Sequence, residues 1–466
     1  METRTQLAAI LDGSASEETK IAYLKNKSII VPPWGGRRGL KREYDPRLHP
    51  VMNRAIYPDI VANGRLEEQT RITYDLQRLA TRRMTELITG TPVKRVYSPQ
   101  NDRQAEVAKY IEAVMARNRV NTINNERCNM LFASCEVVTL WYATEEHNTL
   151  YGFDAPLKLR CRNFAPTLGD ELYPLFDEFG DLIALSIGYR RKVGGDWVQY
   201  FDAYTADRHI KWSNESGSAM HRVEDETSTL GKIPAVYIWR PTPIWEDTSK
   251  IVYEMEWAMS RNGNYLRKNS KPLFAVFAND AITFGGEGDE QESRAILQFP
   301  SGSSAQYITW SQAVENLKYY ISELRQMFFT QLQLPDWSYE SMKSAPMSGE
   351  SRKQLFIDAM LKVKDESGRL AEAFDREINV VKAFLKAMLP LDYHADIDAL
   401  RVDNEITPYT ITEEKDTIAN LMTANGGKPL ITQRESVEAL GWSTDVEKTM
   451  EDLSKQASED AFTPYE

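Results

Sequence analysis

Cysteine and histidine are scarce in this sequence of 466 residues, and neither is arranged for a redox or metal site. The three cysteines, Cys128, Cys135 and Cys161, form no CxxC pair and leave an odd one over. That usage suits a reducing cytoplasm better than a disulfide scaffold. The five histidines are scattered, with no HxH or HExxH spacing, so we expect no bound metal. We expect no cofactor either.

Motifs for nucleotide binding and nucleophilic catalysis are missing as well. The GGKP stretch at 426–429 has proline where a phosphate-binding loop has serine or threonine, so we interpret it as a turn between helices. The glycines at 285–288 stand among acids, which would repel a phosphate. There is no GxSxG elbow, and neither Cys128 nor Cys135 has a histidine close by in sequence. We therefore predict that the chain is not an enzyme and hydrolyses no nucleotide.

The sequence also lacks long apolar runs and a surplus of positive charge. The N-terminus has no signal-peptide core, and the most apolar stretch, 272–278, is too short to cross a bilayer. Lysine and arginine number 56 against 68 acids, a net charge of −12. Tight nonspecific binding to DNA is disfavoured, because it depends on a basic surplus. Loose passage of DNA through an acidic or neutral channel is compatible with this balance.

Periodicity in the first half predicts helices followed by a sheet. Apolar residues at helical spacing predict helices from about Leu66 to Thr89, over 104–117 and over about 122–134. From there to about Arg240, short runs rich in β-branched and aromatic residues alternate with glycine turns, which is typical of antiparallel strands. We predict an α+β domain. The expected strands are 135–143, 157–162, 182–191, 197–205, 209–213 and 235–239.

The second half is dominated by long helical patterns. Helices predicted over 247–269 and 311–333 flank a small insert with an acidic, glycine-rich tip, which describes a hairpin with a knob. A loop at 334–349 precedes a helix of about forty residues that Pro390 ends. The last seventy or so residues read as short helices. TQRES at 432–436 is typical of a helix start.

The order of these segments resembles the portal family of tailed bacteriophages, and in particular portals of long-tailed phages. The usual glycine before the strand at Cys135 is absent, and the first fifty or so residues match no part of the family pattern. The stretches that carry the resemblance are TGTPV (89–93), LYPLFDEFGDLIALSIGYRR (172–191), LGKIPAVYIWR (230–240), SMKSAPMSGESRKQL (341–355) and GKPLITQRESVEALGWSTDVEKTMEDL (427–453).

The resemblance implies the domain organisation of a portal subunit. It implies an α+β wing, a helical stem hairpin, a β-containing clip and a helical crown. The expected boundaries are 1–60 for an N-terminal segment of open role, 61–246 for the wing, 247–270 and 311–333 for the stem helices, 271–310 for the clip, 334–349 for the channel loop, 350–390 for a long wing helix and 391–466 for the crown and tail.

The resemblance also implies a function and partners. A ring of about twelve copies would surround an axial channel for double-stranded DNA at the capsid vertex of the virion, after assembly in the host cytoplasm. The implied partners are the terminase large subunit, a head-tail adaptor, the major capsid protein and scaffolding protein. Two alternatives of other classes remain open: another minor capsid protein, and a DNA-processing enzyme such as a terminase or nuclease.

Two groups of residues are candidates for contact with DNA and with partners. In the channel loop these are Met342, Lys343 and Met347, and on the second stem helix Lys318 and Arg325 could form a polar stripe along the channel. The alternative is that these cations are solvated or ion-paired surface charges. For partner docking the candidates are the clip acids, which alternatively only keep exposed strand edges from aggregating. These acids are Glu287, Asp289, Glu290 and Glu292.

Overall fold

A computed structural model of the chain divides into two compact units, and each is described by itself. The first unit comprises residues 1–336 and 358–409, and the second comprises 337–357 and 410–466. The structure describes residues 2–62, 64–215, 217, 219–269, 273–277, 283–285, 296–298, 304–308, 314–336, 356–408, 432–440, 443 and 446–460.

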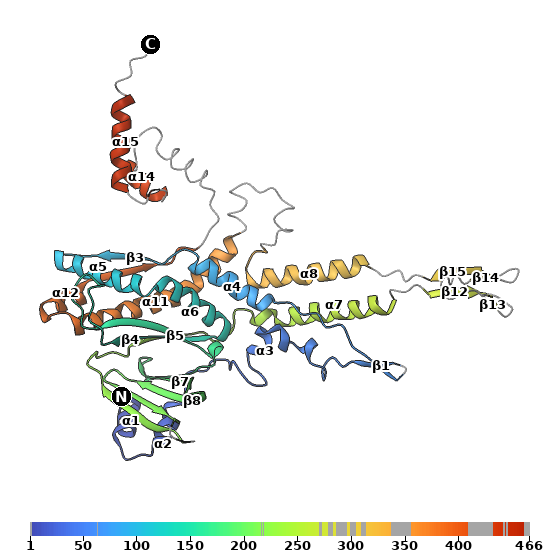
Figure 1. Cartoon of the computed structure of the whole chain (residues 1–466), viewed down its shortest axis with the longest axis horizontal. Helices are drawn as coiled ribbons and strands as arrows, with labels where there is room; N and C mark the ends of the chain where they lie inside the picture. The colour runs from blue at the N-terminus through green and yellow to red at the C-terminus, as the bar shows by residue number, and fades with distance from the viewer. Residues whose placement is uncertain are drawn as a thin grey trace, which may run out of the picture. The chain divides into compact units, whose positions relative to one another are not determined.

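A five-stranded antiparallel meander forms one layer of the first unit (Figure 1). Its strand order is β10-β9-β8-β7-β6. The longest hairpin, β7 to β8, turns at Gly194 and Gly195, whose φ angles of 59° and 107° suit the tight two-residue turn that matches strand twist. The strands are β6 (Glu171–Phe176), β7 (Leu182–Val193), β8 (Asp196–Tyr204), β9 (Arg208–Ser213) and β10 (His221–Thr227).

A three-stranded antiparallel sheet packs on one face of this meander. Its order is β11-β4-β5, with β4 (Glu136–Thr144) between β5 (Lys158–Phe164) and β11 (Ala235–Trp239). Apolar side chains from both sheets form the core between them, which includes Val138, Leu140, Leu185, Ile187 and Tyr237. The alternation of strand side chains therefore gives each sheet one face for this shared core.

Helices cover the other face of the three-stranded sheet. The core beneath them includes Val107, Ile111, Trp141, Val381 and Leu385. The helices are α4 (Leu76–Thr89), α5 (Asp102–Arg117), α6 (Val120–Ser134), α11 (Ile357–Met388) and α12 (His394–Ala399), with a two-stranded sheet of β3 (Lys94–Ser98) and β16 (Arg401–Glu405).

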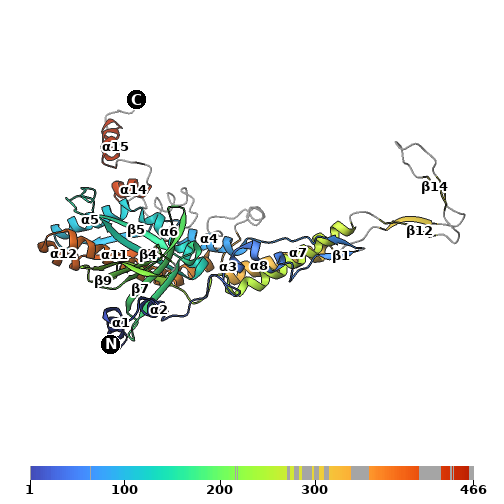
Figure 2. The same cartoon turned by 60° about the horizontal axis from the view of Figure 1, so that its bottom comes forward.

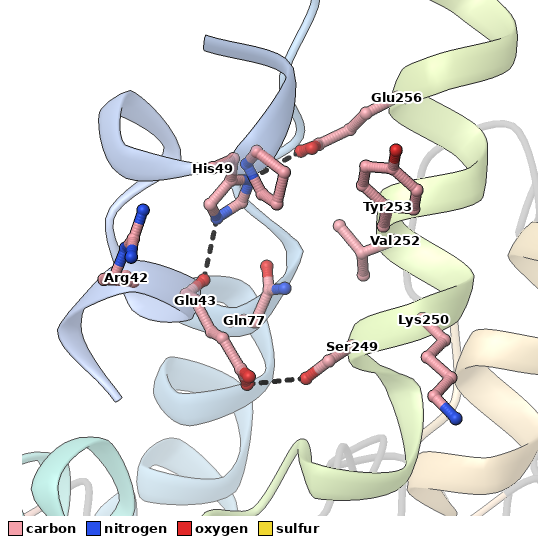
Figure 3. A pocket seen from close by; sticks show the side chains of 10 residues that line it. Arg42, Glu43, His49, Gln77, Ser249, Lys250, Val252, Tyr253 and Glu256 are labelled. Atoms are coloured by element: carbon pink, nitrogen blue, oxygen red, sulfur yellow. Dashed lines mark hydrogen bonds and ion pairs between the residues drawn. The ribbon is translucent and has the colours of Figure 1, made fainter. Parts of the chain in front are cut away.

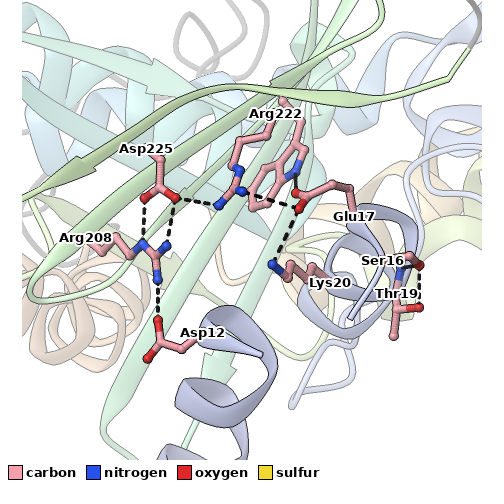
Figure 4. A network of polar contacts seen from close by, with 9 residues as sticks. Asp12, Ser16, Glu17, Thr19, Lys20, Arg208, Arg222 and Asp225 are labelled. Carbon is pink, nitrogen blue, oxygen red and sulfur yellow. Dashed lines mark hydrogen bonds and ion pairs between the residues drawn. The ribbon is translucent and has the colours of Figure 1, made fainter. Parts of the chain in front are cut away.

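The N-terminal helices α1 (Glu2–Asp12) and α2 (Glu17–Leu24) cover the outer face of the meander. Leu7 and Leu11 of α1 pack with Phe201 and Trp212 in this core. Charged groups join the same elements at the rim: Arg208 bridges Asp12 and Asp225, and Glu17 accepts a hydrogen bond from the Trp212 indole (Figure 4). Four layers result: helices, a three-stranded sheet, a five-stranded sheet and an N-terminal helical cap.

The stem hairpin consists of α7 (Ser249–Asn269) and α8 (Val314–Leu332), which lie side by side in Figures 1 and 2. Between them the chain forms two short antiparallel pairs. These are β12 (Leu273–Phe277) with β15 (Ser304–Ile308), and β13 (Thr283–Gly285) with β14 (Ile296–Gln298).

Several short elements lie between the longer ones along the chain of the first unit. They are α3 (Lys41–Tyr44), β1 (Ile60–Ala62), β2 (Arg65–Glu67) and the 3-10 turns η1 (Pro46–Leu48), η2 (Pro50–Met52), η3 (Pro166–Leu168), η4 (Glu246–Thr248) and η5 (Leu391–Tyr393).

The second unit contains α14 (Gln433–Leu440) and α15 (Val446–Asp460). The start of α14 is a capping box: the Glu435 amide donates to Thr432 Oγ1 at 3.2 Å, and the Thr432 amide donates to Glu435 Oε2 at 2.8 Å. The helix start predicted from TQRES is confirmed.

Three sequence-based predictions of secondary structure are wrong. The helix expected from Leu66 begins only at Leu76, because residues 65–67 form β2 and the chain that follows is extended. Within 391–466, where short helices were expected, Arg401–Glu405 is a strand that pairs with β3, and the first unit continues through residue 409. The long helix has 32 residues in α11 rather than about forty.

The missing family glycine before β4 is explained by Cys135. It is the C-cap of α6 and adopts φ 65°, the left-handed conformation in which glycine is favoured at this position. Its amide donates to the Leu131 carbonyl at 2.9 Å, so the cap is formed in spite of the side chain.

Candidate functional site

The stem hairpin is buried at its base and open toward the clip. Near the base, Val252 and Met255 of α7 and Phe328 and Leu332 of α8 are buried. Farther out, exposed apolar side chains include Leu266 of α7 and Tyr319 and Tyr320 of α8, and Met327, nearer the base, is exposed as well. The Tyr320 hydroxyl donates to Glu254 Oε1 at 3.0 Å and joins the two helices there. One hairpin therefore covers the apolar side chains at its base but leaves others along its length exposed.

The two candidate cations on this hairpin, Lys318 and Arg325, lie seven residues apart on α8 and are exposed. That spacing is two helical turns, about 10 Å, so both lie on one side of the helix. Arg325 is ion-paired with Asp336 at 3.0 Å, which ties it to the base of the stem. Lys318 has no ion pair among the described residues.

The end of α8, where the predicted channel loop begins, is held by basic side chains from two other helices. From α4, Arg83 Nη1 donates to the Pro335 carbonyl at 2.8 Å, and its guanidinium lies over the Phe329 ring. From α11, Lys362 Nζ donates to the Leu332 carbonyl at 2.5 Å, where the helix dipole favours a cation. Burial lowers the pKa of Lys362 to about 8. These contacts fix the start of the loop predicted to meet DNA.

Along the other side of α7 runs an extended segment, residues 70–74, that sequence reasoning read as helix. Its alternate backbone amides donate to side chains one helical turn apart on α7: Tyr74 to Glu256 at 2.8 Å, Ile72 to Ser260 at 2.9 Å, and Thr70 to Asn264 at 2.5 Å. Two extended residues advance about 6.7 Å and four helical residues about 6 Å, so the two repeats match.

This polar zipper requires close packing against the helix. A Cβ at Gly263 would lie 2.7 Å from Thr70 Cγ2, so only glycine fits without a shift. Asn264 also donates to the Tyr57 hydroxyl at 2.8 Å and to Gln69 Oε1 at 2.5 Å. Sequence reasoning missed these residues because their partners lie almost two hundred positions away. Gly263 lies inside a helical pattern, and a glycine there was the one local sign that another segment packs closely against the helix.

A buried ion pair extends the attachment toward the base. His49 and Glu256 are 3% and 1% exposed, and His49 Nδ1 lies 2.6 Å from Glu256 Oε1 (Figure 3). His49 Nε2 lies 2.7 Å from the Glu43 carbonyl, which can only accept, so this nitrogen carries a proton. Both ring nitrogens therefore lie against oxygen atoms, and the Glu256 carboxyl group is placed where it stabilises a positively charged ring.

The electrostatics of the pair agree with that protonation state. Burial alone lowers the pKa of His49, but the hydrogen bond and charge of Glu256 outweigh it, so the pKa lies above its ordinary value.

A cavity of about 190 Å³ adjoins the pair, lined by Gln77, Ser249 and Tyr253 among others. We call residues 40–75, which include His49 and the zipper amides, the stem strap.

Neither a reactive thiol nor a metal centre occurs in the described part of the chain. Burial raises the pKa of Cys128, Cys135 and Cys161 to about 12 each, so these thiols are protonated and unreactive near neutral pH. Among the described residues, no three His, Cys, Asp or Glu side chains group as metal ligands. No helix in the same part of the chain is long and apolar enough to cross a membrane.

The remaining candidate residues cannot be placed. Met342, Lys343 and Met347 of the channel loop lie outside the described residues, and so do the clip acids Glu287, Asp289, Glu290 and Glu292.

The layered α+β body with its helical hairpin and β insert is the arrangement that the resemblance to portal proteins implied. The family model for "Phage portal protein, SPP1 Gp6-like" matches residues 23–461. The chain belongs to that SPP1 Gp6-like portal family. The predicted family and the α+β portal fold are thereby confirmed. Because the family is structural, the prediction that the chain is not an enzyme is confirmed too.

Solved structures of gene transfer agent (GTA) particles show a more distant similarity. A chain from the neck of an empty GTA particle computed with C6 symmetry has 12% identity and a TM-score of 0.41, covering 78% of this chain and 89% of its own. Chains from a native GTA virion and from a native GTA neck computed with C12 symmetry have 11% and 13% identity. Both have a TM-score of 0.41 and cover 91% of this chain and 98% of their own. No curated protein matches the sequence.

Proposed function

We propose that the chain is one subunit of a closed ring of about twelve copies, through which DNA enters the capsid during packaging and leaves at ejection. The stem hairpin of this portal-family chain carries the proposal. Along its length it exposes apolar side chains that a single copy does not cover, including Tyr319, Tyr320 and Met327. Such a stripe is stable when neighbouring copies bury it.

The two sides of the hairpin suit a head-to-tail contact. The stem strap lies on one side of α7 and α8 lies on the other (Figure 1). The strap exposes Ile56, Val61 and Leu66. Because one side is strap and the other is helix, each copy can present one surface to the next, and repetition of such a contact closes a ring.

The proposed channel contacts are weak ones. Lys343 in the channel loop is the first candidate for a cation that touches the duplex, between Met342 and Met347. On the stem, Lys318 is the better candidate, since Arg325 is engaged by Asp336. The chain has a net charge of −12. A channel surface with only a few cations would let DNA slide, because it would not bind the phosphates strongly.

The proposed partners dock at the clip and around the vertex. The clip acids Glu287, Asp289, Glu290 and Glu292 would attract first the terminase large subunit and later the head-tail adaptor, raising association rates at low salt. The major capsid and scaffolding proteins would surround the ring during assembly in the host cytoplasm. The packaging ATPase would be the docked terminase and not this chain.

A packaging assay with substituted rings tests the channel proposal. Lys343→Ala should leave ring assembly intact and lower the amount of DNA packaged or retained, with Lys364→Ala, an exposed lysine on α11, as the matched control. Equal packaging by both variants and the unaltered protein would leave Lys343 an ordinary surface residue.

The clip proposal has its own test. Neutralising the four clip acids together should slow terminase or adaptor binding and weaken its salt dependence, with rings still formed. Unchanged rates at low salt would mean that docking rests on the apolar clip strands instead.

A further inference from the structure

The five-stranded and three-stranded sheets have four outer edges, and three of these edges are protected against strand addition. The β6 edge contains Pro174 and a register shift, and Ser28 covers it through the Phe176 amide. The β10 edge has a bulge between Arg222 and Glu224. Prolines, bulges and charges are the means by which natural sheets block their edges.

The third protected edge is β5. Its sequence, KLRCRNF, places three basic residues along the strand, and the Leu159 amide already donates to the Tyr151 hydroxyl at 2.9 Å.

The fourth edge, β11, has no proline, bulge or charged residue, although one of its outward groups, the Trp239 carbonyl, accepts a hydrogen bond from Arg369. Its sequence, AVYIW, contains no charge and no proline, and its register with β4 is unbroken from Ala235 to Trp239. The Trp141 amide donates to the Pro234 carbonyl and the Arg240 amide donates to the Cys135 carbonyl, so the even-numbered residues face β4. The amides and carbonyls of Ala235, Tyr237 and Trp239 therefore face away from the sheet.

A cavity of about 410 Å³ lies against this open edge. Phe176 and Gly180, from the end of β6 and its turn, form one wall, and α11 forms the other. The cavity volume is in the range of sites that take a ligand of several residues or a small molecule. An aromatic wall beside free backbone groups suits an extended peptide, which bonds through its main chain and inserts alternate side chains.

The charge on the α11 wall favours an acidic occupant. Arg376 is paired with Glu372 at 2.6 Å, but Arg369 has no ion pair among the described residues. Arg369 Nη1 donates to the Trp239 carbonyl at 2.8 Å, so its guanidinium is held at the end of the edge. Its other nitrogens can meet a carboxylate.

We propose that the β11 edge is a docking site for an extended, acidic segment of a partner protein, which adds as a fourth strand with a carboxylate against Arg369. This site uses neither the stem hairpin nor the channel loop.

Binding of labelled peptides to the full chain tests the proposal. The probe is fluorescein-labelled Ser-Val-Glu-Val-Glu-Val-Ser, followed by anisotropy. The controls are the same peptide with lysine for glutamate and one N-methylated on the backbone of its central residues. We expect the acidic peptide to bind at least about tenfold more tightly than the lysine peptide and the N-methylated one to lose binding. Arg369→Gln should weaken the acidic peptide about tenfold, while Arg401→Gln, an exposed arginine on β16, should not.

Hydrogen exchange shows where the peptide binds. Amides of residues 235–239 should become protected when the acidic peptide is added. Equal binding of both peptides, or protection confined to other segments, would overturn the proposal. Protection of these amides in the peptide-free protein that grows with protein concentration would also overturn it, by showing that a second copy occupies the edge. The N-methylated peptide keeps the test decisive even where Arg369→Gln disturbs the fold.

Discussion

The pair His49–Glu256 should make attachment of the stem strap depend on pH. The substitution Glu256→Gln keeps the side-chain shape and an oxygen that can accept from the Tyr74 amide, but it removes the charge opposite the imidazolium. A hydrogen bond to a charged group contributes about 1.5–3 kcal/mol, so the variant should lose about 2 kcal/mol at pH 6.

The sign of the pH effect follows from the raised pKa of His49. The charged pair stabilises the attached strap fully below the ordinary histidine pKa, where the ring is protonated in both attached and detached states. That contribution is lost as pH rises through the raised pKa of the attached state. The difference between the unaltered protein and Glu256→Gln should therefore shrink toward alkaline pH.

Local hydrogen exchange is the suitable assay, because it reports on opening of the strap itself rather than on unfolding of the whole chain. A loss of about 2 kcal/mol corresponds to about thirtyfold faster exchange across residues 70–74 at pH 6. Glu254→Gln is the control: it lies on the same helix and contacts Tyr320 rather than the strap. Equal exchange in Glu256→Gln and the unaltered protein at pH 6, or a difference that stays constant to pH 9, would refute the reasoning.

Three further substitutions test the backbone conformation that the structure assigns. Cys135→Gly should cost less than about 1 kcal/mol, because relief of the left-handed φ offsets the lost side chain, whereas Cys128→Gly inside α6 should destabilise by more; thermal unfolding that ranks them the other way would contradict the assigned cap. Gly263→Ala should speed exchange across residues 70–74, since its Cβ would meet Thr70, and unchanged exchange would argue against the zipper. Gly368→Ala on α11 has open space around it and should raise stability by about 0.5–1 kcal/mol in denaturant unfolding; a loss would show that the helix is distorted there.

The elements that could be predicted from the sequence are those whose periodicity is long and whose ends carry a local signal. The helix α5 and the β7–β8 hairpin are examples, since the first has a continuous apolar stripe and the second a Gly-Gly turn. The start of α4 was misplaced because Ile72 and Leu66 fit a helical stripe, while the zipper to α7 holds residues 70–74 extended. A tertiary contact of that kind overrides local propensity.

The candidate site was predictable only in outline. The hairpin and the cations of α8 follow from residue patterns, and the structure places both Lys318 and Arg325 there. The attachment of the stem strap could not be derived, because backbone amides are the donors and every residue type carries one. The strand β16 was missed for a related reason: its sequence, RVDNE, is short and polar, and its pairing with β3 supplies the stability.

Imaging of the purified full-length chain by electron microscopy tests the portal account most directly. The account predicts closed rings of about twelve copies with an axial channel, in which the stem hairpins of adjacent copies bury Tyr319 and Met327. Particles that remain monomers or dimers at micromolar concentration, in the presence as well as the absence of scaffolding and capsid protein, would contradict it.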